Sequence, residues 1–181
     1  MLKNHTKAKS GFTIIEVVLV LAIAGLIFLM VFLALPALQR SQRDTQRRDD
    51  LSGLSTRITD YQSNNRGKVP SDTKWADFLR KYMKQSGDDS IKNTGSEEWT
   101  EKMNEGEFVD PDGSAYGIKV ESGNSGTLNS DFKENNHLIH VYYGAKCGDD
   151  ESVVPATGGS SRQIAFLYPL EGGGVYCGSN S

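Results

Sequence analysis

The sequence predicts an α+β fold in which one long N-terminal α-helix, able to span a membrane in its first half, packs against a small antiparallel β-sheet head. Three observations support this prediction. An uncharged apolar run of 22 residues, 17–38, lies near the N-terminus. A stripe of apolar residues with helical spacing follows it, and the last third of the chain contains short segments in which apolar and polar residues alternate.

The apolar run is long enough to cross a membrane. A helix rises about 1.5 Å per residue, so these residues span about 33 Å, and a hydrocarbon core is about 30 Å thick. The apolar part of a cleaved secretory signal is shorter, about 7 to 15 residues. The leader, 1–11, contains lysines and no acidic residue, and the positive-inside tendency therefore keeps it in the cytoplasm.

One carboxylate, Glu16, lies at the start of this run. A carboxylate within an apolar segment costs about 2.5 to 3.5 kcal/mol on insertion scales unless it lies near the interface or finds a partner. Because Glu16 is near the end of the run, a simple membrane anchor whose side chain reaches the interface is one explanation. The other is a partner for Glu16 within an assembly of helices.

Residues 9–16, Lys-Ser-Gly-Phe-Thr-Ile-Ile-Glu, and the apolar run after them resemble the class III signal of type IV prepilins. In that family a basic leader ends in Gly, the mature chain begins with Phe, and Glu is its fifth residue. The resemblance implies that a membrane aspartyl peptidase cuts between Gly11 and Phe12 and methylates the new amino terminus of Phe12. The apolar segment then remains in the mature protein as the core of a filament.

This resemblance gives Glu16 an assembly role. A buried carboxylate needs a counter-charge when helices leave the lipid and pack together, and the amine of Phe12 on a neighbouring subunit is the cation at that depth. The pair would also fix the axial register of each subunit. Members of the family commonly have a Gly and then a Pro where the helix can break in the filament. Gly25 and Pro36 are the candidates, although Pro36 lies later than the usual place.

Residues 39–65 are expected to continue the helix as an amphipathic segment. The first part is almost entirely polar, and Arg43 and Arg47 at helical spacing predict a solvated surface. A charged juxtamembrane helix is the commoner case. A nucleic-acid contact is the alternative, because four arginines lie close together here: Arg40, Arg43, Arg47 and Arg48. Apolar residues then return at helical spacing and predict docking on the head: Leu51, Leu54, Ile58 and Tyr61.

The remaining residues, 66–181, predict one globular α+β head. A helix is expected where large apolar residues recur at helical spacing: Trp75, Phe78, Leu79, Tyr82 and Met83. Residues 85–107 predict mostly loop, and strands are expected near 116–120, 139–143, 164–168 and 175–177. Residues 110–116 resemble the Asp-Pro-x-Gly-x-x-Tyr turn that precedes the sheet in many pilins and pseudopilins.

Cys147 and Cys177 are the only cysteines. Both follow the predicted membrane crossing, so in an oxidising exterior we expect a disulfide that ties the last strand and tail to the sheet. Two buried free thiols are the alternative.

Metal sites and cofactors are not expected. Two cysteines without clustered histidines do not predict zinc, and His137 and His140 are expected on opposite faces of a strand. Some related secretion pseudopilins bind calcium in a C-terminal loop, which makes Asp149, Asp150 and Glu151 the candidates for that ion. An acidic run beside a glycine is more often a solvated turn.

The sequence contains no catalytic motif, so the protein is expected to be the substrate of a peptidase and not an enzyme. The resemblance implies a structural subunit of a type IV pilus-like filament with roles in adhesion, twitching motility or DNA uptake. The alternatives are a pseudopilin of a type II secretion-like system, and a singly anchored surface binding protein that keeps its leader.

The implied partners are other copies of the chain, other pilins, the prepilin peptidase and methyltransferase, the pilus assembly platform with its ATPase, and the membrane before assembly. The expected localisation is a single-pass precursor in the inner or cytoplasmic membrane, followed by an extracellular surface filament. Loss of the leader lysines leaves 17 basic against 23 acidic residues, a net side-chain charge of −6 that disfavours indiscriminate nucleic-acid binding.

Overall fold

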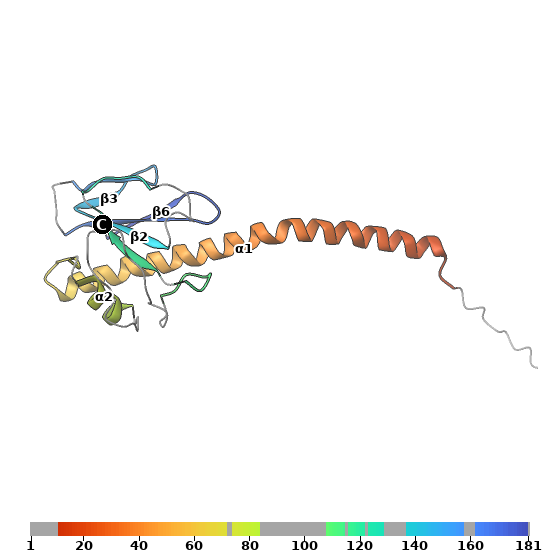
Figure 1. Ribbon diagram of the computed structural model, residues 1–181, viewed down its shortest axis with the longest axis horizontal. Helices are drawn as coiled ribbons and strands as arrows, with labels where there is room; N and C mark the ends of the chain where they lie inside the picture. Colours follow the sequence, from red (N-terminus) through yellow and green to blue (C-terminus); the bar gives the residue numbers. More distant parts are fainter. Residues whose placement is uncertain are drawn as a thin grey trace, which may run out of the picture. The chain divides into compact units, whose positions relative to one another are not determined.

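The computed structural model describes residues 11–71, 74–83, 108–114, 116–121, 123–128, 137–157 and 162–180. The chain divides into two compact units, Met1–Gln39 and Arg40–Ser181. One helix, α1 (Ile14–Asn64), contributes to both of them and is drawn as a continuous ribbon in Figure 1. Its bounds agree with the long helix that the sequence predicts.

The part of α1 in the first unit is apolar and exposed. Every buried residue of α1 lies in its second half: Asp44, Arg47, Leu51, Leu54 and Ile58. Among the described helices, α1 alone is long and apolar enough to cross a membrane. The helix continues through Gly25 and Pro36, so neither residue breaks it in the single chain, and a break within a filament remains a prediction.

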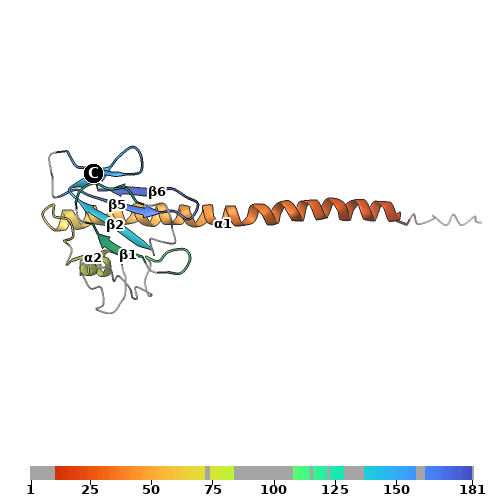
Figure 2. The same ribbon diagram turned by 45° about the horizontal axis from the view of Figure 1, so that its top comes forward.

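The second unit contains a four-stranded sheet in the order β1-β2-β5-β6. Its strands are β1 (Gly117–Val120), β2 (Leu138–Tyr143), β5 (Ile164–Pro169) and β6 (Val175–Ser179). Figure 2 shows them side by side over the second half of α1. A smaller antiparallel sheet pairs β3 (Ala145–Cys147) with β4 (Val153–Pro155), and the sequence patterns did not predict these two short strands.

The predicted fold class is confirmed, with one difference in the sheet. The β2–β5 and β5–β6 pairs are antiparallel, but β1 and β2 are parallel, with Ile118 opposite Ile139. A parallel pair needs a connection of about a dozen residues or more. The connection between these strands, 121–137, is long enough for that, so a local alternation of residues does not determine strand direction here.

The central strands of the sheet, β2 and β5, are buried on both faces. One face packs against the apolar stripe of α1, whose Leu51, Leu54 and Ile58 are completely buried, and against α2 (Trp75–Tyr82). The other face packs against the smaller sheet in a second cluster that includes Tyr142, Val153 and Leu167. Strand β5 is buried at all of its positions, which explains its nearly continuous apolar sequence.

Candidate functional site

The segment before α1 is open to solvent. Gly11 and Phe12 precede the first helical residue, and the Phe12 side chain is 89 % exposed. A Cβ atom built on Gly11 would meet no atom within 4 Å. The peptide bond between these residues therefore lies in non-helical backbone that the described residues do not cover.

Glu16 and Thr13 together cap the N-terminal end of α1. One oxygen of its carboxylate, Oε2, accepts hydrogen bonds from the Thr13 backbone N–H and hydroxyl, both at 2.9 Å. The Glu16 N–H donates in return to the Thr13 hydroxyl at 3.4 Å. This reciprocal arrangement is a capping box, which satisfies two backbone donors at the helix start. The Thr-x-x-Glu spacing is the sequence signal of a capping box. The resemblance to type IV prepilins gives Glu16 an assembly role only and does not include this cap.

The exposed apolar surface is concentrated in one stretch of the chain. The large hydrophobic side chains that are exposed in the described structure all lie within 12–38. A surface of this size is far beyond what a soluble monomer normally exposes, and it needs lipid or other helices around it. Residues 40–64 of the same helix bury their apolar stripe in the head instead.

Residues 6–32 match the family model for the prokaryotic N-terminal methylation motif, which is the class III signal peptide of type IV pilins and pseudopilins. The chain carries a prepilin signal. No curated protein and no solved structure matches the chain. The prepilin signal and the exposed apolar helix together fit a membrane-anchored precursor.

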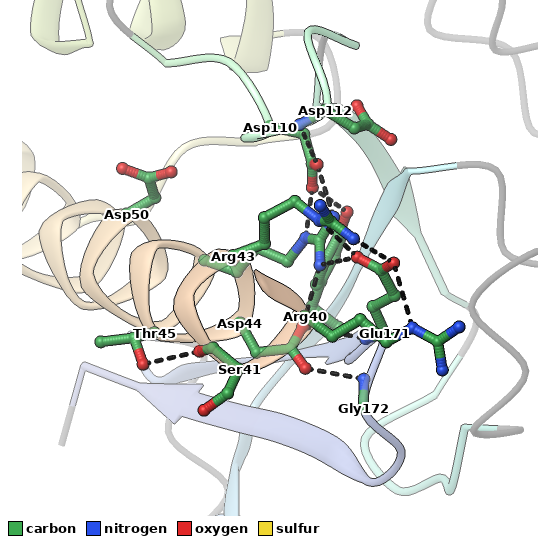
Figure 3. Close-up of polar contacts among 12 residues, drawn as sticks. Arg40, Ser41, Arg43, Asp44, Thr45, Asp50, Asp110, Asp112, Glu171 and Gly172 are labelled. Carbon is green, nitrogen blue, oxygen red and sulfur yellow. Dashed lines mark hydrogen bonds and ion pairs between the residues drawn. The ribbon is translucent and has the colours of Figure 1, made fainter. Parts of the chain in front are cut away.

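A charged cluster connects the second half of α1 to the rest of the head (Figure 3). Arg47 donates from Nε and Nη2 to the two carboxylate oxygens of Asp110, with both distances at 2.7 Å. Its Nη1 lies 2.9 Å from Asp44 Oδ1 and 3.2 Å from Glu171 Oε2. The Arg47 side chain is completely buried, so this guanidinium depends entirely on its partners within the chain.

Asp44 and Arg43 hold the turn between β5 and β6. The Asp44 carboxylate accepts the backbone N–H groups of Glu171, at 2.9 Å, and Gly172, at 2.7 Å, as Figure 3 shows for Gly172. Arg43 donates from Nε and Nη2 to the two oxygens of Glu171 at 2.8 and 2.6 Å. A Cβ atom at position 172 would lie 2.8 Å from Asp44 Oδ2, so the close approach requires glycine there.

These contacts shift the pKa values of several side chains in the cluster. Hydrogen bonds from Arg43, followed by those from Arg47, lower the pKa of Glu171 to about 2 despite partial burial. Burial by itself would raise the pKa of Asp110, but the hydrogen bonds from Arg47 and the other donors outweigh it and lower that pKa. The Tyr168 hydroxyl donates to Asp110 at 2.9 Å, and burial together with the Asp110 charge raises the pKa of Tyr168. The carboxylates of Glu171 and Asp110 therefore remain charged at neutral pH.

The prediction of a solvated surface at Arg43 and Arg47 is wrong. Arg43 is partly buried and Arg47 is fully buried, because the head supplies carboxylates that compensate both charges. Extending the apolar stripe backward from Leu51 in steps of four and three residues reaches Arg47 and Asp44. That extension is the sequence signal that places both side chains on the buried side of α1. The guanidinium groups of Arg43 and Arg47 thus contact their own head instead of an outside polyanion.

A disulfide joins Cys147 on β3 to Cys177 on β6, the pair expected from the sequence. It links the smaller sheet to the last strand of the larger one.

The calcium candidates do not converge on one point. Glu151 accepts the Val175 N–H at 3.1 Å, and Asp150 accepts the Ser152 hydroxyl. Within the described residues, neither they nor Asp149 belong to a group of three ligands that one ion could bridge. The acidic run instead supports the turn before β4 and the start of β6.

Another group, Asp110, Asp112 and His137, does bring three ligand atoms within 4.8 Å of one another. Arg47 and the Tyr168 hydroxyl already donate hydrogen bonds to the Asp110 carboxylate. The Arg47 guanidinium therefore supplies the positive charge that compensates this carboxylate. His140 lies elsewhere, with its Nδ1 2.6 Å from Glu121 Oε1. His137 precedes the first residue of β2 and has a positive φ of 60°, so the expectation that both histidines lie on one strand is wrong.

Proposed function

We propose that this chain is a structural subunit of a type IV pilus-like filament, cut after Gly11, N-methylated on Phe12 and assembled through the apolar half of α1. The exposed apolar surface of 12–38 beside a prepilin signal is the observation that carries this proposal. In the membrane, lipid covers that surface. Outside the membrane, the same segments of neighbouring copies are the surface that can replace lipid.

Processing and assembly are linked through the charge on Phe12. Before cleavage the Phe12 nitrogen is part of a neutral peptide bond. Cleavage converts it into an amine, and the Glu16 carboxylate of a neighbouring copy then has a cation to pair with. Until that pairing, the two donors of Thr13 satisfy one oxygen of Glu16 within the chain. We therefore propose that Glu16 first caps its own helix and then pairs between subunits.

The head is the part of the subunit that a filament would display. Adhesion, twitching motility and DNA uptake are the proposed roles of such a filament. The same subunit design would serve a short periplasmic pseudopilus of a type II secretion-like system. Recovery of the protein from sheared surface material is expected for a pilus, whereas recovery only from the cell envelope would indicate the pseudopilus.

The first experiment is to measure the intact mass and N-terminal sequence of the native protein from membranes and from a sheared surface fraction. We expect sheared fibres whose subunits begin at N-methylated Phe12. A chain that still begins at Met1 and occurs only in membranes would mean a simple membrane anchor and would overturn the proposal.

Two substitutions separate processing from assembly. Gly11→Val should leave the leader attached and prevent assembly. Glu16→Gln should be cleaved normally because its amide oxygen can still accept from Thr13, but it removes the counter-charge and should not enter fibres. Normal fibre yield from Glu16→Gln would contradict the charge pair, and normal cleavage of Gly11→Val would contradict the processing site.

A further inference from the structure

Three consecutive charged residues of α1 lack an ion pair in the described structure. Arg43, Arg47 and Arg57 each pair with a carboxylate. In contrast, Arg48 and Asp49 make no ion pair within the described part of the chain, and Asp50 contacts the Tyr116 hydroxyl at 3.1 Å without a cation. Within the described residues, a single helix turn thus carries one positive charge and two negative charges without an ion pair.

These opposite charges face different sides of the head. Successive residues on a helix point about 100° apart, so neighbours in sequence do not share a face. Arg48 is exposed. Burial raises the pKa of Tyr176 on β6, and the positive charge of Arg48 opposes that shift, so Arg48 lies on the side of the helix towards β6. Asp49 and Asp50 line a hollow of about 290 Å³, whose other walls come from α1, α2 and the residues next to α2 and the 110–113 turn: Gly53, Arg57, Tyr82, Met83 and Phe108.

The described lining of the hollow contains little positive charge. Arg57 is its one described cation, and this side chain makes its ion pair with Asp60 at 3.4 Å. Burial raises the pKa of Asp50, the Tyr116 hydrogen bond lowers it, and the charges of Asp110 and Asp49 raise it further. The carboxylate of Asp50 therefore experiences repulsion from two other carboxylates, which a guanidinium placed in the hollow would relieve.

We infer that Arg48 of one copy enters the hollow of a neighbouring copy and pairs there with Asp49 and Asp50. This inference rests on the proposed filament function and identifies a specific contact between its subunits. The apolar walls from Tyr82, Met83 and Phe108 suit the methylene stem of an arginine, and the two carboxylates suit its charged end. Because the two surfaces of the contact differ, each copy can bind one neighbour on each side, and such a contact propagates into a polymer.

Charge reversal tests the contact. Arg48→Glu should lower the yield of sheared fibres by about tenfold or more, because it places a third carboxylate against Asp49 and Asp50. Asp49→Lys should have a similar effect, and the double variant Arg48→Glu/Asp49→Lys should recover part of the yield. Lys68→Glu is the matched control, since Lys68 is an exposed cation beyond the end of α1, and it should leave the yield unchanged. Unchanged urea unfolding of Arg48→Glu would show that its head remains folded.

A cross-link provides a second measurement. Arg48→Lys keeps the charge and supplies an amine that a zero-length carbodiimide reagent can join to a carboxylate in contact with it. After digestion of treated fibres, we expect two copies of the peptide containing residues 48–50 joined to each other. Each chain has one such peptide, so this product comes from two subunits.

The outcomes separate this inference from the proposed function. If the wild-type chain forms no fibres, the proposed function fails and the inference fails with it. If wild-type fibres form but Arg48→Glu matches their yield and no joined peptide is found, the filament stands and the Arg48 contact is wrong. A tenfold loss together with the joined peptide supports both.

Discussion

The guanidinium of Arg47 and the carboxylate of Asp110 share two hydrogen bonds of 2.7 Å, and neither side chain is exposed. The pair joins the middle of α1 to a turn more than sixty positions later in the sequence. A buried pair of this kind is costly to break, because removal of one partner leaves the other charge without compensation.

Arg47→Met should therefore lower the free energy of unfolding by about 3–5 kcal/mol. Urea unfolding of the full chain in detergent, followed by tryptophan fluorescence, measures this loss. Arg57→Met is the matched control, because Arg57 makes an exposed ion pair with Asp60 at 3.4 Å, and it should cost less than about 1 kcal/mol. Equal losses from the two substitutions would contradict the importance of the buried pair.

The lowered pKa of Glu171 predicts that the folded protein loses stability in acid. Its pKa falls from 4.5 in the unfolded chain to about 2 in the folded protein, chiefly through the hydrogen bonds from Arg43. The stabilisation is complete above the unfolded pKa and disappears as the pH falls from about 4.5 towards 2. The unfolding midpoint of the wild type should fall more steeply in this window than that of Glu171→Gln. Parallel pH profiles for the two proteins would show that Glu171 does not contribute.

The lowered pKa of His140 predicts a second loss of folding stability, nearer to neutral pH. Burial lowers its pKa, although Glu121 opposes that shift, and its Nε2 is buried without a hydrogen-bond partner among the described residues. An unfolded histidine takes up a proton near pH 6.5, so the unfolded state gains protons first as the pH falls, and stability decreases below about that value. Urea unfolding at pH 7.5 and 5 should show a larger loss for the wild type than for His140→Leu. The same loss in both would exclude His140 as its source.

Gly172→Ala should destabilise the β5–β6 turn. The new Cβ would lie 2.8 Å from Asp44 Oδ2 and displace the carboxylate from the two N–H groups that it accepts. We expect a loss of about 0.5–1.5 kcal/mol, the net contribution of a typical hydrogen bond, because these two bonds are only partly buried. Gly53→Ala is the control, because a Cβ there meets no atom within 4 Å and alanine favours the helix by about 1 kcal/mol. A stabilising effect of both substitutions would contradict the close approach at Gly172.

Removal of the disulfide should lower stability by about 3–4 kcal/mol in the loop-entropy model, since the two cysteines lie 30 positions apart. Urea unfolding of Cys147→Ser/Cys177→Ser measures the loss. Addition of a reductant should bring the wild type to the level of this variant and leave the variant unchanged. A wild type that is insensitive to reduction would contradict the contribution of the bond.

The sequence is informative where one local pattern determines one structure. The apolar run and the stripe from Leu51 to Ile58 predict α1, and the alternating segments predict the positions of β1, β2, β5 and β6. Strands β3 and β4 have only three residues each, too few for a periodic signal. The parallel direction of β1 is set by a long connection and by packing, which local alternation does not report.

The polar contacts at the head were harder to predict for a similar reason. The apolar stripe extended backward from Leu51 places Arg47 on the buried side of α1, but it does not identify the partners of Arg47, which are Asp110 and Glu171. Those partners come from distant parts of the chain, and no spacing rule connects them. The capping box between Thr13 and Glu16 is different, because its two residues are three positions apart and its pattern is readable from the sequence.

The close approach of Asp44 to Gly172 also restricts how the sequence can vary at position 172. A side chain at position 172 is excluded only while a carboxylate at position 44 occupies the adjacent space. Among relatives that share this turn, the two positions should change as a pair, with glycine retained wherever the aspartate is present. A chain that loses the aspartate also loses the constraint, and position 172 then becomes free to diversify.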